Sequence, residues 1–167
     1  VGTTNDGGRC VENIYTVTLN SDYYPDANGD GTPTTAADPN TLYVKYGIGW
    51  YQDEDATTEI DKLNSLPKHT GYKFGGFYTG KAGTYDLIID SACYPLPDTE
   101  KKFTDNVILY AKWTPITYTV DYDSNNGQGT GPESTICTYD TTHTIPTNTF
   151  SKDGYRFSSW NTKPDGT

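Results

Sequence analysis

Apolar and polar residues alternate in several short segments of this chain, the pattern of β-strands that bury one face. In the first such segment Tyr15, Val17 and Leu19 share one face, and the threonines between them point the other way. The segments expected to form strands are residues 15–19, 42–46, 72–78 and 107–113. Pro115 follows the last of them and is expected to end the unit, because proline has no backbone N–H to donate. The alternation predicts a β-rich domain.

Residues 59–66, between the second and third of these segments, follow a different spacing. Ile60, Leu63 and Leu66 recur every three residues, which predicts a short helix that Pro67 ends. The matching stretch of the second half, residues 140–149, is rich in threonine, a poor helix former, so an irregular or extended crossover is expected there. The expected fold class is therefore α+β and β-rich.

The chain also contains an internal repeat. YTVTLNS at residues 15–21 matches YTVDYDS at 118–124, and GYKFGGFYT at 71–79 matches GYRFSSWNT at 154–162. The matches occur in the same order, and the first copy has longer connections, which belong in surface loops. The second copy stops before any counterpart of the strand expected at 107–113. The expected organisation is a lead segment at 1–12, a first repeat with enlarged loops at 13–115, and a C-terminally incomplete second repeat at 116–167.

These motifs resemble the Listeria–Bacteroides repeat, also called the internalin B-repeat, over roughly residues 14–167, and VILYAKW at 107–113 is the most diagnostic of them. The resemblance implies two tandem small β-grasp-like domains, similar to ubiquitin and SUMO, on a bacterial surface or secreted protein. It implies a stalk, spacer or adhesion-associated role and no catalysis. The chain departs from the family pattern in the length of its first copy and in the missing last strand of its second.

The function expected from this resemblance is a non-catalytic structural or adhesion module of an extracellular, cell-surface bacterial protein. The alternative is a glycan- or protein-binding module that uses the enlarged loops of the first repeat. Expected partners are further repeats or domains of the same polypeptide, a host or cell-surface protein or glycan, and a second copy bound through the open sheet edge. The chain starts at Val1 and contains no Met, so we expect a mature or excised piece of a longer protein.

Charge narrows the range of partners. The formal net charge is −10, and Arg9 and Arg156 are the only arginines. Contacts with phosphate need clustered Lys and Arg, so neither nucleic acid nor an anionic membrane surface is an expected partner. No run of 18 apolar residues occurs, so membrane insertion of this segment is not expected. Aromatic residues make up 14% of the chain, which argues against a disordered protein.

One short motif has the spacing of a calcium loop. DANGDG at residues 26–31 fits the first half of an EF-hand-type loop, in which oxygen ligands at alternate positions surround Ca²⁺. Asp26, Asn28 and Asp30 would be the side-chain ligands, and Asp38 is a weaker candidate because the twelfth position of the loop is Ala37. The alternative is a cluster of turn-forming residues on an acidic surface. No other cofactor is expected.

Two further groups of residues are candidates for binding. Tyr23, Tyr24, Trp50 and Tyr51 lie in or beside segments peculiar to the first copy, so they are candidates for stacking on a sugar or a partner side chain. The aromatic residues that recur in both copies are expected to fill the core instead. A second acidic cluster, at residues 53–55 with Glu59 and Asp61 beyond, either holds a cation or forms a solvated loop.

Cysteine and histidine residues do not indicate an enzyme. The three cysteines are Cys10, Cys93 and Cys137, and an odd number leaves at least one thiol free or paired with another chain. In an oxidising compartment Cys10 and Cys93 are the expected disulfide, since both lie in the first half. No HExxH, GxSxG or P-loop motif occurs. The chain is therefore expected to be non-catalytic.

Overall fold

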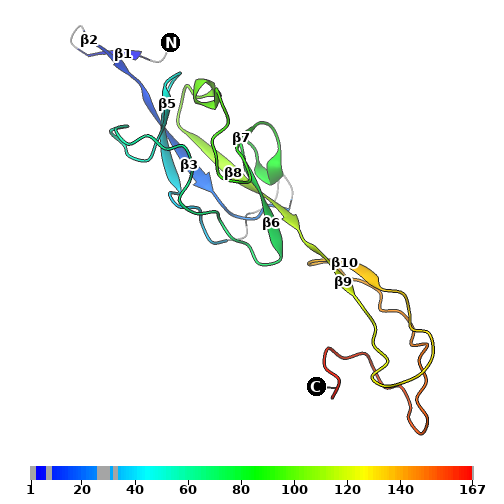
Figure 1. Ribbon diagram of the computed structural model, residues 1–167. Coiled ribbons are helices and arrows are strands. Elements are labelled where there is room, and N and C mark those ends of the chain that lie inside the picture. The colour runs from blue at the N-terminus through cyan, green and yellow to red at the C-terminus, as the bar shows by residue number, and fades with distance from the viewer. Residues whose placement is uncertain (1–2, 7–8, 26–30, 32–33, 167) are drawn as a thin grey trace. The chain divides into compact units, whose positions relative to one another are not determined.

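The computed structural model describes residues 3–6, 9–25, 31 and 34–166 (Figure 1). The chain divides into two compact units, Val1–Thr114 and Pro115–Thr167. Unit 1 and unit 2 are described separately below.

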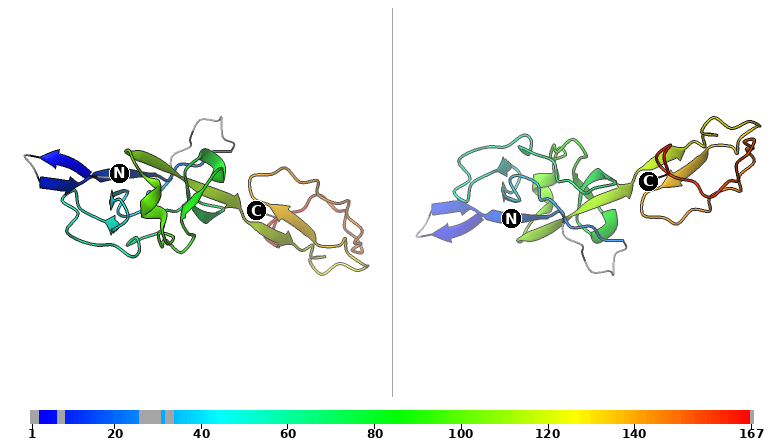
Figure 2. Two further views of the ribbon diagram at one scale, coloured as in Figure 1. Left: turned by 90° about the horizontal axis from the view of Figure 1, so that it is seen from above. Right: turned by 90° about the horizontal axis from the view of Figure 1, so that it is seen from below.

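Unit 1 is built around one mixed β-sheet with the strand order β5-β4-β3-β8-β6-β7 (Figures 1 and 2). Its strands are β3 (Ile14–Asn20), β4 (Thr41–Lys45), β5 (Gly49–Tyr51), β6 (Tyr72–Tyr78), β7 (Leu87–Ile89) and β8 (Val107–Pro115). β3 and β8 pair in parallel at the centre, whereas β3–β4, β4–β5 and β6–β7 are antiparallel. A separate hairpin, β1 (Thr3–Asp6) and β2 (Arg9–Glu12), precedes the sheet. The four strands expected from the alternation are therefore confirmed.

The core of unit 1 follows the alternation of its strands. Val17 and Leu19 of β3 are buried, and Thr18 between them is exposed. On β8, Leu109 is fully buried and Ile108 beside it is 47% exposed. Full burial of one such aliphatic side chain contributes about 1.5–3 kcal/mol. Further core residues are Leu42, Val44, Leu63, Phe77, Ile88, Ile89, Phe103, Ala111 and Trp113.

The helix expected at residues 59–66 is wrong. This stretch is irregular, and its backbone N–H groups donate to neighbouring segments instead of to a carbonyl four residues earlier. Ile60 N donates to Trp50 O (2.9 Å), and Leu63 N donates to Cys93 O (3.1 Å). Leu63 is buried, but Leu66 is 42% exposed, so the three-residue spacing does not mark one buried face.

Helical structure in the described residues is limited to two short 3₁₀ turns, η1 (Lys81–Gly83) and η2 (Thr99–Lys102). The α component of the expected α+β class is therefore wrong, and the fold is β-rich with almost no helix. The crossover between β5 and β6 is formed by loops, and backbone N–H groups of these loops, such as those of Leu63 and Ser65, donate to Cys93 O and Asp38 O.

Unit 2 has one antiparallel pair, β9 (Thr117–Val120) and β10 (Thr135–Thr138), and is otherwise irregular. Residues 154–162, which match the β6 region in sequence, form no strand. Tyr155 is 73% exposed, whereas the matching Tyr72 packs against the core of unit 1. In unit 1, β6 is hydrogen-bonded between β8 and β7, and the described residues of unit 2 contain no counterpart of β8. In the part of unit 2 that the structure describes, this segment pairs with no strand.

Gly76 occupies a position in β6 that no other residue fits. Its φ is +107°, and a Cβ atom there would lie 2.6 Å from the carbonyl oxygen of Ile89 on β7. The close approach of the two backbones coincides with a register shift between β6 and β7 at Phe77/Tyr78. Glycine is thus required for this pairing.

We expect Gly76→Ala to lower the free energy of unfolding by about 2–4 kcal/mol, because it adds both backbone strain and a clash with Ile89. Urea titration followed by tryptophan fluorescence measures the loss. Gly47→Ala is the matched control: Gly47 has φ +68° but nothing within 4 Å of a Cβ, so it should cost only about 1 kcal/mol. Equal losses for the two variants would contradict this account.

Candidate functional site

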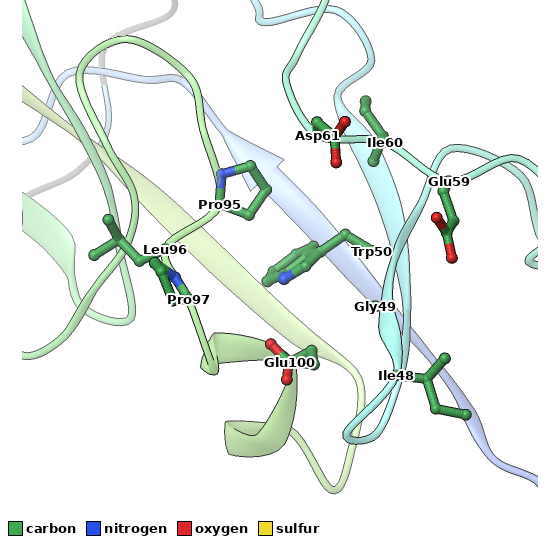
Figure 3. Close-up of a pocket in the computed structure, with 10 residues that line it drawn as sticks. All are labelled: Ile48, Gly49, Trp50, Glu59, Ile60, Asp61, Pro95, Leu96, Pro97 and Glu100. Atoms are coloured by element: carbon green, nitrogen blue, oxygen red, sulfur yellow. The ribbon is translucent and has the colours of Figure 1, made fainter.

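A hollow of about 230 Å³ lies at the edge of unit 1, beside β5 (Figure 3). Three segments that are distant in sequence form it: the end of the β4–β5 turn with β5, the loop at residues 59–61, and the loop that runs from Pro95 into η2. The lining residues are Ile48, Gly49, Trp50, Glu59, Ile60, Asp61, Pro95, Leu96, Pro97 and Glu100.

Trp50 lies at the centre of this hollow (Figure 3). Its strand is held by pairing with β4 on one side, where Trp50 is opposite Val44, and by the bond from Ile60 N to Trp50 O on the other. The indole packs edge-on against Phe103, with ring centroids 5.7 Å apart, and is only 6% exposed. The ring is therefore fixed by backbone pairing and by core packing.

The indole nitrogen of Trp50 has no hydrogen-bond acceptor among the described residues, although it is buried. The other two tryptophans differ in this respect. Trp113 Nε1 donates to Ser21 O (2.9 Å), and Trp160 Nε1 donates to Pro146 O (3.1 Å). A buried donor without an acceptor costs about 1–3 kcal/mol. Trp50 is thus an exception that needs an explanation.

The wall opposite β5 is held in place by backbone hydrogen bonds. Leu96 N donates to Ile88 O (2.8 Å), and both the backbone N–H and the hydroxyl of Thr99 donate to Leu96 O. Thr99 is 3% exposed, so this anchor is buried. Glu100 is the next residue of η2 after Thr99, and these contacts set its position.

The hollow is acidic. Glu59, Asp61 and Glu100 line it, and no lysine, arginine or histidine does. The two lysines that follow Glu100 are engaged elsewhere, since Lys101 pairs with Asp98 and Lys102 with Asp86. The remaining lining side chains are apolar, so the site offers hydrogen-bond acceptors and apolar surface together.

Unit 2 encloses a much larger hollow, of about 1420 Å³, lined by most of its residues. Ligand pockets usually measure about 300–1,000 Å³, so this space is larger than a typical ligand pocket. Trp160 is its main packing centre, and the rings of Tyr122, Phe150 and Phe157 lie 4.9, 6.1 and 5.0 Å from it. In unit 2 these aromatic rings thus pack on Trp160 beside a large open space.

Comparison with known families concerns this second unit. Residues 118–167 match the Listeria-Bacteroides repeat domain. The resemblance seen in the sequence is therefore supported for unit 2, whereas the family match does not extend over unit 1, and two tandem copies are not established.

Two curated proteins of Evansella cellulosilytica are similar to the chain. One, described as a proposed Gly-rich membrane protein, is 33% identical over 102 residues, which cover 58% of this chain and 11% of that protein. The other, described as a proposed membrane protein, is 30% identical over 154 residues, which cover 82% of this chain and 22% of that protein. The chain thus spans about a tenth and a fifth of these relatives. No solved structure matches it significantly.

The described residues contain no helix with the length and apolar character needed to cross a membrane.

The four aromatic candidates of unit 1 do not form an exposed platform. The exposed fractions of Tyr24, Trp50 and Tyr51 are 9%, 6% and 5%. Tyr23 is partly buried and packs on Tyr72, with ring centroids 4.7 Å apart. Tyr24 packs on Tyr110 and accepts a hydrogen bond from Asn20, which explains its burial. Of the four, only Trp50 lines a hollow described here.

The predicted calcium ligands Asp26, Asn28 and Asp30 lie outside the described residues. The fourth candidate, Asp38, is exposed, and its carboxylate accepts a hydrogen bond from Asn64 Nδ2 (3.5 Å). Within the ranges that the structure describes, no group of three or more His, Cys, Asp or Glu side chains could hold a metal ion. Calcium binding at residues 26–31 stays a prediction.

The acidic cluster at residues 53–55 organises its own loop. Asp53 accepts hydrogen bonds from the backbone N–H groups of Thr57 (2.9 Å) and Thr58 (2.7 Å) and from the Thr57 hydroxyl. These bonds, the one from the Thr57 backbone first, lower the pKa of Asp53 to about 2. Glu59 and Asp61 line the hollow instead. Sequence reasoning missed Glu100, because nothing in the sequence indicates that η2 lies beside β5.

Cys93 is a free thiol and fully buried. Burial first, and the charge of Asp90 second, raise its pKa to about 11. Cys10 belongs to β2, and its side chain lies outside the described part. The expected Cys10–Cys93 disulfide stays a prediction. Cys137 is also buried and free.

We expect Cys93 to resist alkylation in the folded chain. With a pKa of about 11, its thiolate fraction at pH 8 is about a thousandth, roughly 100-fold below that of an unperturbed thiol, and burial slows the reaction further. Iodoacetamide labelling with peptide mass spectrometry, in buffer and in urea, measures this. The same mass spectrometry detects any peptide pair linked through Cys10 and Cys93. Finding this linked pair as the main species would overturn the assignment of a free thiol.

Proposed function

We propose that this chain is a non-catalytic repeat segment of an extracellular bacterial surface protein, in which small β-domains act as spacers. The observation that carries the proposal is the match of residues 118–167 to a repeat domain family. The two relatives support it, because both are much longer than this chain and both are described as membrane proteins. Attachment to the surface and any part in adhesion belong to the proposal.

The topology of unit 1 supports a β-grasp-like interpretation of the repeat. Its first and last long strands, β3 and β8, pair in parallel at the centre of the sheet, with β4 and β5 on one side and β6 and β7 on the other. Unit 2 repeats the first step of this arrangement, because β9 and β10 pair antiparallel as β3 and β4 do. We propose that the two units are copies of one plan, of which unit 2 contains the first hairpin.

The junction between the units suits a spacer. β8 ends at Pro115 and β9 begins at Thr117, so Ile116 is the whole connection. A connection this short leaves no room for a further element between the two units. The net charge of −10 disfavours self-association of an extended array. Further repeats or domains of the same polypeptide are the proposed neighbours.

Labelling of intact cells tests the surface placement. In cells that carry the full-length protein, a membrane-impermeant amine-reactive biotin should modify the exposed residues Lys62, Lys68 and Lys73. Mass spectrometry of the captured peptides detects the label, and a cytoplasmic protein of the same cells is the control. Labelling that occurs only after the cells are lysed would overturn the proposal.

Independence of the two units is a second test of the spacer role. Leu109→Ala in the whole chain should destabilise unit 1 by about 2–5 kcal/mol, because it leaves a cavity in the core. The indole NMR signal of Trp160 in unit 2 should not change. Ile108→Ala, at the exposed neighbouring position, is the matched control and should cost less than about 1 kcal/mol. A shift of the Trp160 signal that accompanies the loss of unit 1 would contradict independent units.

A further inference from the structure

We propose that the hollow around Trp50 binds one sugar unit of a neutral polysaccharide. This inference goes beyond the spacer function and does not depend on it. It rests on the chemistry that the lining leaves unsatisfied: a buried donor without an acceptor, three carboxylates without a cation in the lining, and apolar surfaces that face the same space.

The indole N–H of Trp50 requires an acceptor from the ligand. Figure 3 shows the nitrogen on the side of the ring toward Glu100, yet the Glu100 carboxylate does not accept its hydrogen. The nitrogen is covered in this structure, and Glu100 is only partly buried. In the proposed complex the Glu100 side chain moves outward, and a ligand oxygen takes the place beside Nε1. Binding then supplies the acceptor that the buried donor lacks in the free protein.

The carboxylates require a ligand that also donates. Glu59, Asp61 and Glu100 accept hydrogen bonds and repel anions, so a phosphate, sulfate or uronic acid does not fit the lining. An ammonium or guanidinium group would satisfy the carboxylates but has no acceptor to offer Trp50. A hydroxyl group does both, because its oxygen accepts from the indole while its hydrogen is donated to a carboxylate. A polyol therefore fits better than a cationic peptide.

The apolar part of the lining favours a ring. Trp50 projects from β5 toward Pro95, Leu96 and Pro97 on the opposite wall, and all four present flat or compact apolar surfaces (Figure 3). The C–H face of a pyranose can pack on such surfaces while its hydroxyl groups point to the acids. A volume of about 230 Å³ is below the usual range for drug-sized ligands, which limits the site to a single unit.

The three tryptophans of the chain make a direct test possible. In the ¹⁵N-labelled whole chain, titration with glucose, galactose, mannose, N-acetylglucosamine and their β- and α-linked trimers should shift the indole N–H signal of Trp50 in a saturable way for at least one sugar. The signals of Trp113 and Trp160 should stay in place, since both already have acceptors. Trp50→Phe assigns the signal by its loss, and the unchanged Trp113 signal shows that this variant is folded.

Charge-neutralising variants test the role of the acids. Glu100→Gln and Asp61→Asn should each weaken binding about tenfold, because both keep the shape of the side chain but lose the strong acceptor. Glu54→Gln removes the same charge from an exposed residue outside the lining and should leave binding unchanged.

Three results would overturn the assignment. The first is that no sugar shifts the Trp50 signal, and the second is that Glu54→Gln weakens binding as much as Glu100→Gln. The third is that a Gly-Lys-Gly or Gly-Arg-Gly peptide shifts the signal and no sugar does, which would make the hollow a site for cationic peptides.

Discussion

The parallel pairing of β3 with β8 is the constraint on which unit 1 depends. Val17 lies opposite Val107, and Leu19 lies opposite Leu109. Because side chains alternate along a strand, this register places Val17, Leu19 and Leu109 in one core, and a slip by one residue would expose them. Parallel strands also need a long connection between them. Everything from β4 to β7 lies within that connection, so its loops are required by the topology.

The strands were predicted correctly from the sequence, whereas the helix predicted at residues 59–66 is wrong. Both outcomes have the same physical reason. Alternation along β3 and β8 reports burial on one side of a sheet, and burial is what fixes those strands. The three-residue spacing of Ile60, Leu63 and Leu66 reports burial only if a helix places them on one face. In the structure only Leu63 is buried, and its N–H donates to Cys93 O, a partner far away in the sequence. Local spacing contains no information about such a partner.

Two similar sequence segments of this chain differ in structure. GYKFGGFYT forms β6 in unit 1, whereas GYRFSSWNT is irregular in unit 2, and Tyr72 is packed where Tyr155 is exposed. A strand is stabilised by hydrogen bonds to its neighbours, so a sequence with high β-propensity forms one only where a neighbouring strand is present. In the described part of unit 2 the rings of Tyr122, Phe150 and Phe157 lie around Trp160, and no strand forms at residues 154–162.

The Trp50 hollow lies between the edge strand β5 and two connections, which explains why the sequence revealed only part of it. Trp50 could be singled out because it lies in a segment peculiar to the first copy, and Glu59 and Asp61 because they are acidic. Their association with Pro95–Pro97 and Glu100 arises from the fold, since the bond from Leu96 N to Ile88 O brings that loop beside β5. Trp50 packs in the core, yet its indole N–H is unpaired at a site lined with carboxylates. The carboxylates come from loops and a short turn beside the rigid sheet, and such positions are where binding residues are most often found.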